Sequence, residues 1–405
     1  MRQQGDRPPG RATPRGDAAD PLDPSGGSPG HDPPLAGLLE QAAERLREGD
    51  PRGAIEAWQR ALGLRPPAAA QAGLLRAIGD AYAGLGAHEE AVEAYSRAVK
   101  ADPGLAPAWL GLGSGRERTG DVDAAAACYR RAVEADPSQP AAWNRLGVAL
   151  DRLSRHEESL DCFARAGELA PDSADVWFHR GNACMGLNDN EAAVAAYKMA
   201  LRHEPEDSRV WFNLGQAFSR RGEKEAALGA YREALLRRPD DPAAWYNLAN
   251  VYFDAGQFIA AIACYQQSLT LQPDDFDAWN NMGSCWTHMA DVEEAIRCFA
   301  RAVDANPSAA SCWNNLGHAW SRLGDQEHAV ACFKEAIRIE EEQAAYYLNR
   351  ALAYARLGST DEVLSDLRRA LKLNPLLSDL LPTLAPLSPL AGDPRFRELL
   401  EEPPA

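Results

Sequence analysis

Apolar and polar residues alternate along most of this chain in a pattern that returns every 34 residues. In one period, Trp279, Met282, Gly283 and Trp286 follow the spacing i, i+3, i+4, i+7, which predicts an amphipathic helix. A second run around Phe299 has the same helical spacing. A glycine or another helix breaker separates the two runs, and a proline often follows the second. Each period therefore predicts two helices joined by a tight turn.

Tryptophan marks the period most clearly, and other positions are counted from it, so that position +4 lies four residues later. The tryptophans are Trp109, Trp143, Trp177, Trp211, Trp245, Trp279 and Trp313. Position +4 is small, with Gly113, Gly147, Gly181, Gly215, Ala249, Gly283 and Gly317. Position +20 is aromatic, with Tyr129, Phe163, Tyr197, Tyr231, Tyr265, Phe299 and Phe333. We expect the tryptophans to be buried between repeats, each removing ~150–250 Å² from water, and the small residues to let helices approach closely.

The residues at these positions resemble the pattern of the tetratricopeptide repeat (TPR) family, in which Trp, Leu-Gly, Tyr, Ala, Phe and Pro recur with a period of 34. The resemblance implies an all-α fold, an α-α solenoid that winds as a right-handed TPR superhelix around a concave groove. Ten repeats are expected, at 35–68, 72–105, 106–139, 140–173, 174–207, 208–241, 242–275, 276–309, 310–343 and 344–377.

Two segments depart from the repeat. Residues 1–34 are rich in Pro, Gly, Asp and Arg and contain little to bury, so we expect a disordered tail. Residues 378–405 are expected to cap the last repeat, because a repeat array needs a polar end. Within them, Asp393 and Pro394 are typical of the N-cap and the first residue of a short helix.

Position +2 of the first helix lies opposite its buried positions when each residue advances 100°, and the TPR resemblance implies that this face lines the groove. Five successive repeats have asparagine there: Asn213, Asn247, Asn281, Asn315 and Asn349. Asparagine is a mediocre helix former, but its amide offers a donor and an acceptor that complement a peptide group. This ladder is similar to the asparagine ladder of the O-linked N-acetylglucosamine transferases, which implies a grip on peptide backbone. The alternative is that these residues only stabilise the array.

Other groove positions extend the candidate peptide site. They are Phe212, Tyr246, Asn280 and Asn314 at +1, Asn250 at +5, Arg209 at −2 and Arg220 at +9. The aromatic side chains at +1 could equally pack between helices. Groove positions hold nine arginines and five acidic residues, so the groove is expected to be mildly basic and to favour acidic, extended segments of a protein or peptide partner. Arginine near a helix C-terminus is also favourable without any ligand.

Composition narrows the class of partner and the location. The net charge of −17 and the pI of about 5.0 argue against general nucleic-acid binding. No apolar run is long enough to span a membrane, and the N-terminus lacks the apolar core of a signal peptide. Cysteine recurs at +19, at Cys128, Cys162, Cys264, Cys298 and Cys332. That position favours a small packed side chain, and unpaired cysteines fit a reducing, cytoplasmic location.

Catalytic motifs are missing from the sequence. The glycine-rich stretch 111–115 falls inside a predicted helix and follows no strand, so it does not indicate a phosphate-binding loop. We therefore expect no enzyme, metal or cofactor, and a non-enzymatic scaffold for protein–protein interaction. Two alternatives remain open: an assembly or oligomerisation factor that uses convex or terminal surfaces, and a regulatory subunit of a separate transferase.

Overall fold

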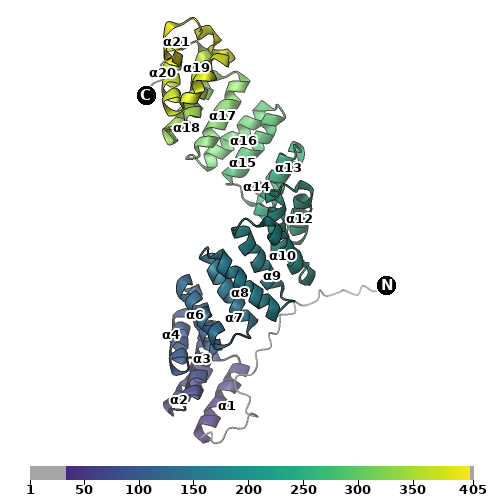
Figure 1. Ribbon diagram of the computed structural model, residues 1–405, viewed down its shortest axis with the longest axis vertical. Coiled ribbons are helices and arrows are strands. Elements are labelled where there is room, and N and C mark those ends of the chain that lie inside the picture. The colour runs from purple at the N-terminus through teal and green to yellow at the C-terminus, as the bar shows by residue number, and fades with distance from the viewer. Residues whose placement is uncertain (1–32, 402–405) are drawn as a thin grey trace, which may run out of the picture. The chain divides into compact units, whose positions relative to one another are not determined.

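The computed structural model describes residues 33–401, and within them every regular element is a helix, as the repeat pattern predicted. Figure 1 shows the helices following one another along the chain in pairs. The expected tail lies outside the described residues, except for Pro33 and Pro34, which begin α1. The chain divides into two units, one ending at Leu187 and the other beginning at Asn188.

The first unit holds α1 (Pro33–Arg47), α2 (Pro51–Gly63), α3 (Ala68–Gly84), α4 (His88–Ala101), α5 (Ala106–Arg118), α6 (Val122–Ala135), α7 (Pro140–Arg152), α8 (His156–Leu169) and α9 (Ala174–Gly186). The second holds α10 (Asn190–His203), α11 (Ser208–Arg220), α12 (Lys224–Arg237), α13 (Pro242–Asp254), α14 (Phe258–Leu271), α15 (Phe276–His288), α16 (Val292–Ala305), α17 (Ala310–Leu323), α18 (Gln326–Ile339), α19 (Ala344–Leu357), α20 (Thr360–Leu373) and α21 (Pro394–Glu401). Three 3-10 helices, η1 (Pro375–Asp379), η2 (Leu381–Thr383) and η3 (Ala385–Leu390), lie between α20 and α21.

Each pair consists of a first helix, here the A helix, and a second, the B helix. The odd-numbered helices α1 to α19 are the A helices. Within each unit, an A helix packs on its own B helix where both belong to that unit, and each B helix packs on the next A helix of the same unit. Successive A helices of the second unit, from α11 to α19, also contact one another directly. They therefore form a continuous row on which position +2 returns once per helix.

Aromatic rings at +20 fill the space inside each pair. Tyr231, Tyr265, Phe299 and their equivalents are at most 3% exposed. A Cβ added to Gly283 would lie 2.8 Å from the ring of Phe299. The distances to the ring of the same repeat are similar, 2.5–2.8 Å, for Gly113, Gly147, Gly215 and Gly317. The prediction that +4 is small to permit close approach is confirmed, and the partner is the ring on the B helix of the same repeat.

The turn inside each pair requires a left-handed residue. Glycine supplies it at Gly86, Gly120, Gly222, Gly256, Gly324 and Gly358, all with positive φ, as predicted for a helix C-terminus. Three repeats place another residue at the same point: Ser154, Asn188 and Ala290, with φ of 59°, 59° and 63°. The turn is therefore fixed by the packing of the two helices even where the sequence lacks glycine.

The expectation that the period tryptophans are buried is wrong, because all seven are only half-buried. Each indole Nε1 instead donates a hydrogen bond of 2.8–3.0 Å to a backbone carbonyl six residues earlier, at the proline that follows the preceding B helix. The partly buried rings of Trp109, Trp143, Trp279 and Trp313 pack against the apolar clusters of their repeats. The tryptophan thus ties the loop between two repeats to the A helix, and proline recurs there without blocking the contact because its carbonyl is the acceptor.

The C-terminal segment closes the second unit with an apolar cluster. Leu381, Leu387 and Phe396 are buried against Leu367 and Leu371 of α20. The helix α21 begins at Pro394, and the carboxylate of the preceding residue, Asp393, accepts a hydrogen bond from the Arg395 amide at 2.9 Å. Figure 1 shows these elements beside α19 and α20.

Candidate functional site

All five ladder asparagines lie in the second unit, on the A helices α11, α13, α15, α17 and α19. Each is half-buried. They share position +2 on helices that contact one another in succession, so the fold arranges the amides as one row. The first unit has Gly111, Arg145 and His179 at +2 of α5, α7 and α9, and no such row.

Three of the ladder residues bond along the row. The Nδ2 of Asn281 donates to the hydroxyl of Tyr246 at 3.0 Å. Nδ2 of Asn315 donates to Oδ1 of Asn280 at 2.9 Å. In each case the acceptor is the +1 residue of the preceding repeat.

Asn349 repeats the arrangement, since its Nδ2 donates to Oδ1 of Asn314 at 2.8 Å. The Oδ1 atoms of Asn281, Asn315 and Asn349 accept no hydrogen bond within residues 33–401, and they are not sealed off from solvent. The amide nitrogens are therefore held by the protein, while the carbonyl oxygens remain available to accept a donor.

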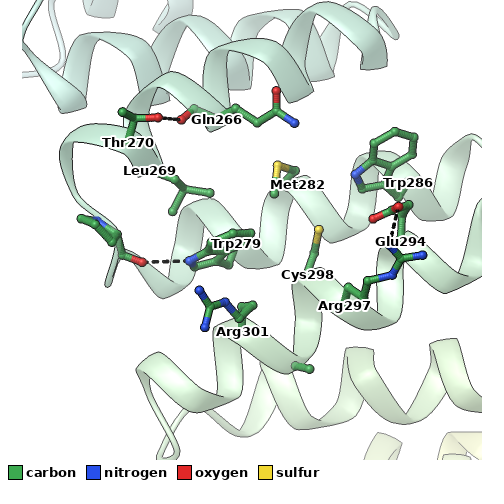
Figure 2. A pocket seen from close by; sticks show the side chains of 12 residues that line it. Gln266, Leu269, Thr270, Trp279, Met282, Trp286, Glu294, Arg297, Cys298 and Arg301 are labelled. Carbon is green, nitrogen blue, oxygen red and sulfur yellow. Dashed lines mark hydrogen bonds and ion pairs between the residues drawn. The ribbon is translucent and has the colours of Figure 1, made fainter.

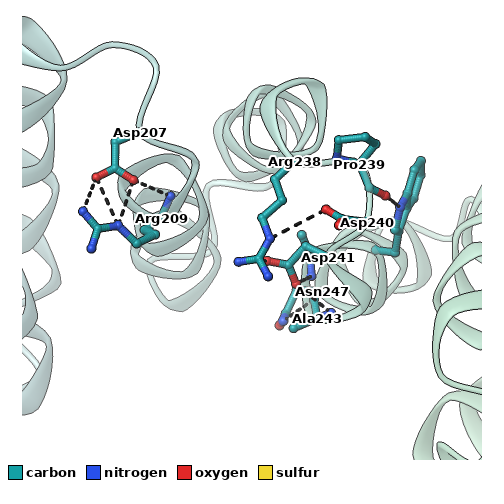
Figure 3. Close-up of polar contacts among 10 residues, drawn as sticks. Asp207, Arg209, Arg238, Pro239, Asp240, Asp241, Ala243 and Asn247 are labelled. Atoms are coloured by element: carbon teal, nitrogen blue, oxygen red, sulfur yellow. Dashed lines mark hydrogen bonds and ion pairs between the residues drawn. The ribbon is translucent and has the colours of Figure 1, made fainter. Parts of the chain in front are cut away.

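Asn247 behaves differently. Its Nδ2 donates to the backbone carbonyl of Ala243 on its own helix, at 2.8 Å, and Figure 3 shows the side chain folded back in this way. The +1 residue of the preceding repeat is Phe212, which has no acceptor. Asn213 is half-buried on α11, at the start of the row.

The aromatic side chains at +1 pack inside their own repeats. Phe212 lies edge-on to Tyr231 with ring centroids 5.8 Å apart, and Tyr246 lies on Tyr265 at 5.9 Å. The Tyr265 hydroxyl donates to Oδ1 of Asn250, which also lies 3.4 Å from the Nδ2 of Asn281. The structure therefore brings together Tyr246, Asn250 and Asn281, which the sequence had only placed on one face.

The predicted groove arginines divide into two kinds. The guanidinium of Arg209 is held by the carboxylate of Asp207, with Nη2 2.6 Å from Oδ2, as Figure 3 shows. Although partial burial opposes it, the hydrogen bonds from Arg209 keep the pKa of Asp207 below its usual value. Arg220 is exposed at the end of α11. Arg209 is thus largely neutralised by its neighbour.

Arg322 and Arg356, both at +9, reach back to position +8 of the preceding repeat. Arg322 Nη1 donates to the carbonyl of Thr287 at 3.1 Å, and Arg356 donates to the hydroxyl of Ser321. Neither has an acidic partner within the part of the chain that the structure describes. This pairing between repeats was not predicted. The sequence signal for it was a hydrogen-bonding residue at +8 of one repeat together with an arginine at +9 of the next.

A small cleft of about 240 Å³ opens beside the ladder between α15 and α17. Asn315, His318 and Arg322 from α17 face Ser284 and Thr287 from α15. Arg322 is the only arginine or lysine among the residues that line the cleft, and no acidic residue lines it. The cleft has the size and polarity to take one polar or acidic side chain.

A larger pocket of about 930 Å³ lies on the other side of α15, between α14 and α16. Figure 2 shows Trp279, Met282 and Trp286 lining it from α15. The guanidinium of Arg301 lies 5.6 Å from the Trp279 ring centroid, a cation–π contact. The sequence signal for this pocket was the pair of tryptophans seven residues apart on one helix.

The cysteines at +19 are buried and unpaired, in agreement with the packing role predicted for them. Burial raises the pKa of the Cys298 thiol to about 12.

Residues 111–115 lie inside α5, as expected, and a Cβ on Gly111 would lie 2.4 Å from the Tyr95 ring. No three His, Cys, Asp or Glu side chains of the described residues converge as a metal site requires. In the same range, the helices are all too short or too polar to cross a bilayer.

Comparison with protein families agrees with this architecture. Tetratricopeptide repeat models match residues 39–106, 110–174 and 175–217. The model of the cilia and flagella-associated protein 70 C-terminal domain matches residues 198–387. The chain is a tetratricopeptide-repeat protein, and none of these matching models describes a catalytic domain. No curated protein sequence matches it significantly.

Solved structures of similar fold include MamA, which is 23% identical and has a TM-score of 0.40 over 43% of this chain and 94% of its own. YrrB, described as a TPR protein with an unusual peptide-binding site, is 21% identical, with a TM-score of 0.42 over 46% of this chain and 96% of its own. PilF of Pseudomonas aeruginosa is 18% identical, with a TM-score of 0.45 over 51% and 95%. These similarities concern the helical repeat and carry nothing about a ligand.

Proposed function

We propose that this TPR protein is a non-enzymatic scaffold that binds an extended segment of a partner protein along the ladder of its second unit. The observation that carries the proposal is the row of amides on α15, α17 and α19, whose nitrogens are held by the preceding helix while their oxygens remain available. Neighbouring helices pack ~8–10 Å apart, and an extended chain advances ~3.3–3.6 Å per residue. One amide per repeat therefore meets about every third ligand residue.

The chemistry of the row favours a backbone-reading mode with modest selectivity. Each amide–backbone hydrogen bond contributes ~0.5–1.5 kcal/mol net, so three give about 1.5–4.5 kcal/mol before the ligand pays for being ordered. Side-chain contacts must supply the rest. Arg322 and Arg356, which lack acidic partners among the described residues, favour acidic side chains on the ligand.

The test uses a fluorescein-labelled 12-residue peptide, (Glu-Thr-Ser)4, and fluorescence anisotropy. Its acidic residue at every third position matches one per repeat, and threonine favours an extended chain. A variant with all five ladder asparagines changed to alanine should bind at least tenfold more weakly. Its circular dichroism should be unchanged, because alanine is the better helix former.

The matched control changes Gln266, Thr270 and Arg301 to alanine at the tryptophan-lined pocket on the other side of α15. This variant should bind the probe as the wild type does. Equal binding by the ladder variant and the wild type would contradict the proposal. So would loss of the helical signal in the ladder variant, since the asparagines would then be structural.

The tryptophan-lined pocket favours a second candidate function, an assembly factor that uses its outer surface. The pocket is the larger of the two described here and has an aromatic wall. If the control variant, and not the ladder variant, lost the probe, this second function would replace the first.

A further inference from the structure

The ladder asparagines differ in the acceptor they use, and the difference follows a single residue in the preceding repeat. Where +1 is Tyr246, Asn280 or Asn314, the next ladder asparagine donates to it at 2.8–3.0 Å. Where +1 is Phe212, Asn247 turns back to its own helix. A side chain with an acceptor at +1 thus coincides with a ladder amide directed along the row.

Phe212 and Tyr246 form a natural matched pair. Their rings pack on the B-helix tyrosine of their own repeat in the same way, at 5.8 Å and 64° for one and 5.9 Å and 61° for the other. The two rings differ in the hydroxyl, to which Asn281 donates at 3.0 Å; Asn250 at +5, whose counterpart beside Phe212 is Gln216, lies farther from the same amide nitrogen, at 3.4 Å. A hydroxyl added to the Phe212 ring would offer Asn247 the kind of acceptor that Tyr246 offers Asn281.

We propose that position +1 orients the ladder, so that an acceptor there holds the amide nitrogen of the next asparagine and leaves its carbonyl oxygen to accept N–H groups of the bound segment. This inference deepens the proposed function and rests on it. Tyr246, Asn280 and Asn314 are then positioning residues that act through the ladder. The part of the ligand that is recognised is the backbone N–H, because the carbonyl oxygen is left without a partner among the described residues, while one hydrogen of each amide nitrogen is already used within the protein.

Orientation matters energetically because an asparagine amide in water rotates among several states. An amide held by one 2.8–3.0 Å hydrogen bond has already lost that freedom before the ligand arrives, so less is lost on binding. Asn247, bonded to Ala243, must break that bond to join the row. Asn281, Asn315 and Asn349 are therefore oriented along the row, whereas Asn247 is turned away from it.

The reciprocal substitutions Tyr246→Phe and Phe212→Tyr test this with little change in packing. Measured with the (Glu-Thr-Ser)4 probe, Tyr246→Phe should weaken binding about two- to tenfold, the range for one hydrogen bond. Phe212→Tyr should strengthen it by a similar factor. In a background with Asn281→Ala, Tyr246→Phe should have no further effect, because the residue it positions is gone.

A second readout needs no ligand. In nuclear magnetic resonance spectra of the free full-length protein, the side-chain amide signals of Asn281 should shift in Tyr246→Phe, and those of Asn247 should shift in Phe212→Tyr. A merely structural role for the hydroxyl would not move them selectively. Unchanged amide signals in both variants would overturn the inference.

The two readouts separate this inference from the proposed function. If the amide signals respond as expected but the wild type shows no saturable binding of the probe or of (Gln-Thr-Ser)4, the orientation device exists and the peptide groove does not. If the wild type binds, and Tyr246→Phe binds equally well in a background that retains Asn281, the groove stands and the orienting role falls.

Discussion

Ala290 stands in the left-handed turn between α15 and α16 with a φ of 63°, where most repeats use glycine. The left-handed conformation costs an L-residue with a Cβ about 1–2 kcal/mol. Replacing alanine by glycine also makes the unfolded chain more flexible, which costs about 0.4–1 kcal/mol of stability. The balance predicts that Ala290→Gly raises the free energy of unfolding by about 0.5–1 kcal/mol.

The reverse substitution is available in the preceding repeat. Gly256 has a φ of 71°, and a Cβ added there would meet no atom within 4 Å, so Gly256→Ala tests the backbone alone. It should lower the free energy of unfolding by about the amount that Ala290→Gly raises it. Urea denaturation followed by circular dichroism measures both changes, with hydrogen exchange at the two turns to localise them.

The signs of the two changes in the free energy of unfolding test whether the left-handed conformation governs this turn. A loss of stability in Ala290→Gly, or a gain in Gly256→Ala, would show that side-chain contacts rather than the left-handed conformation govern this turn. The double variant should be close to the wild type in stability, because the two turns lie in different repeats and their effects should add.

Three further predictions concern packing and charge. Gly283→Ala should destabilise the chain, since its Cβ would lie 2.8 Å from the Phe299 ring, while Gly229→Ala, which meets no atom within 4 Å, should stabilise by about 0.5–1 kcal/mol; thermal melts compare them. Asp366→Asn should cost about 3–5 kcal/mol in urea denaturation, because half-buried Arg350 would lose the charge of the buried carboxylate that it meets with two bonds, at 2.6 and 2.8 Å. Exposed Asp361→Asn, which removes a 2.7 Å pair with Arg395, should cost under about 1 kcal/mol. Burial raises the pKa of Cys298 and Cys285 from 9.0 to about 12, so between these pH values the unfolded chain releases protons that the folded chain retains. The free energy of unfolding should therefore fall as pH rises from 9 to 12, by up to about 1.4 kcal/mol per pH unit for each thiol. Cys298→Ala should reduce that slope.

The sequence by itself determined the helical repeat. The period of 34, the aromatic residue at +20 and the small residue at +4 depend on contacts inside one pair of helices, such as Gly283 against Phe299. Such contacts join residues close in the chain, and they recur in every copy, so a repeated pattern reveals them. The left-handed turn at Gly256 was equally readable, because glycine is the residue that adopts positive φ most easily.

The role of the period tryptophans needed the structure. A tryptophan that recurs on an apolar helical face indicates burial, yet Trp279 is only half-buried and its Nε1 donates to the carbonyl of Pro273. That carbonyl belongs to the loop of the preceding repeat. A backbone acceptor leaves no mark in the sequence pattern beyond the proline itself.

The ladder shows the same division most clearly. Its five positions were visible because one helix face repeats along the chain, but the direction of each amide depends on a residue 35 positions earlier, such as Tyr246 for Asn281. Helix periodicity gives the face on which a side chain lies and says nothing of the neighbouring helix that supplies its acceptor. Only the packing of α13 against α15 brings these two residues to 3.0 Å. Asn247, which follows Phe212 instead of a tyrosine, donates to Ala243 on its own helix.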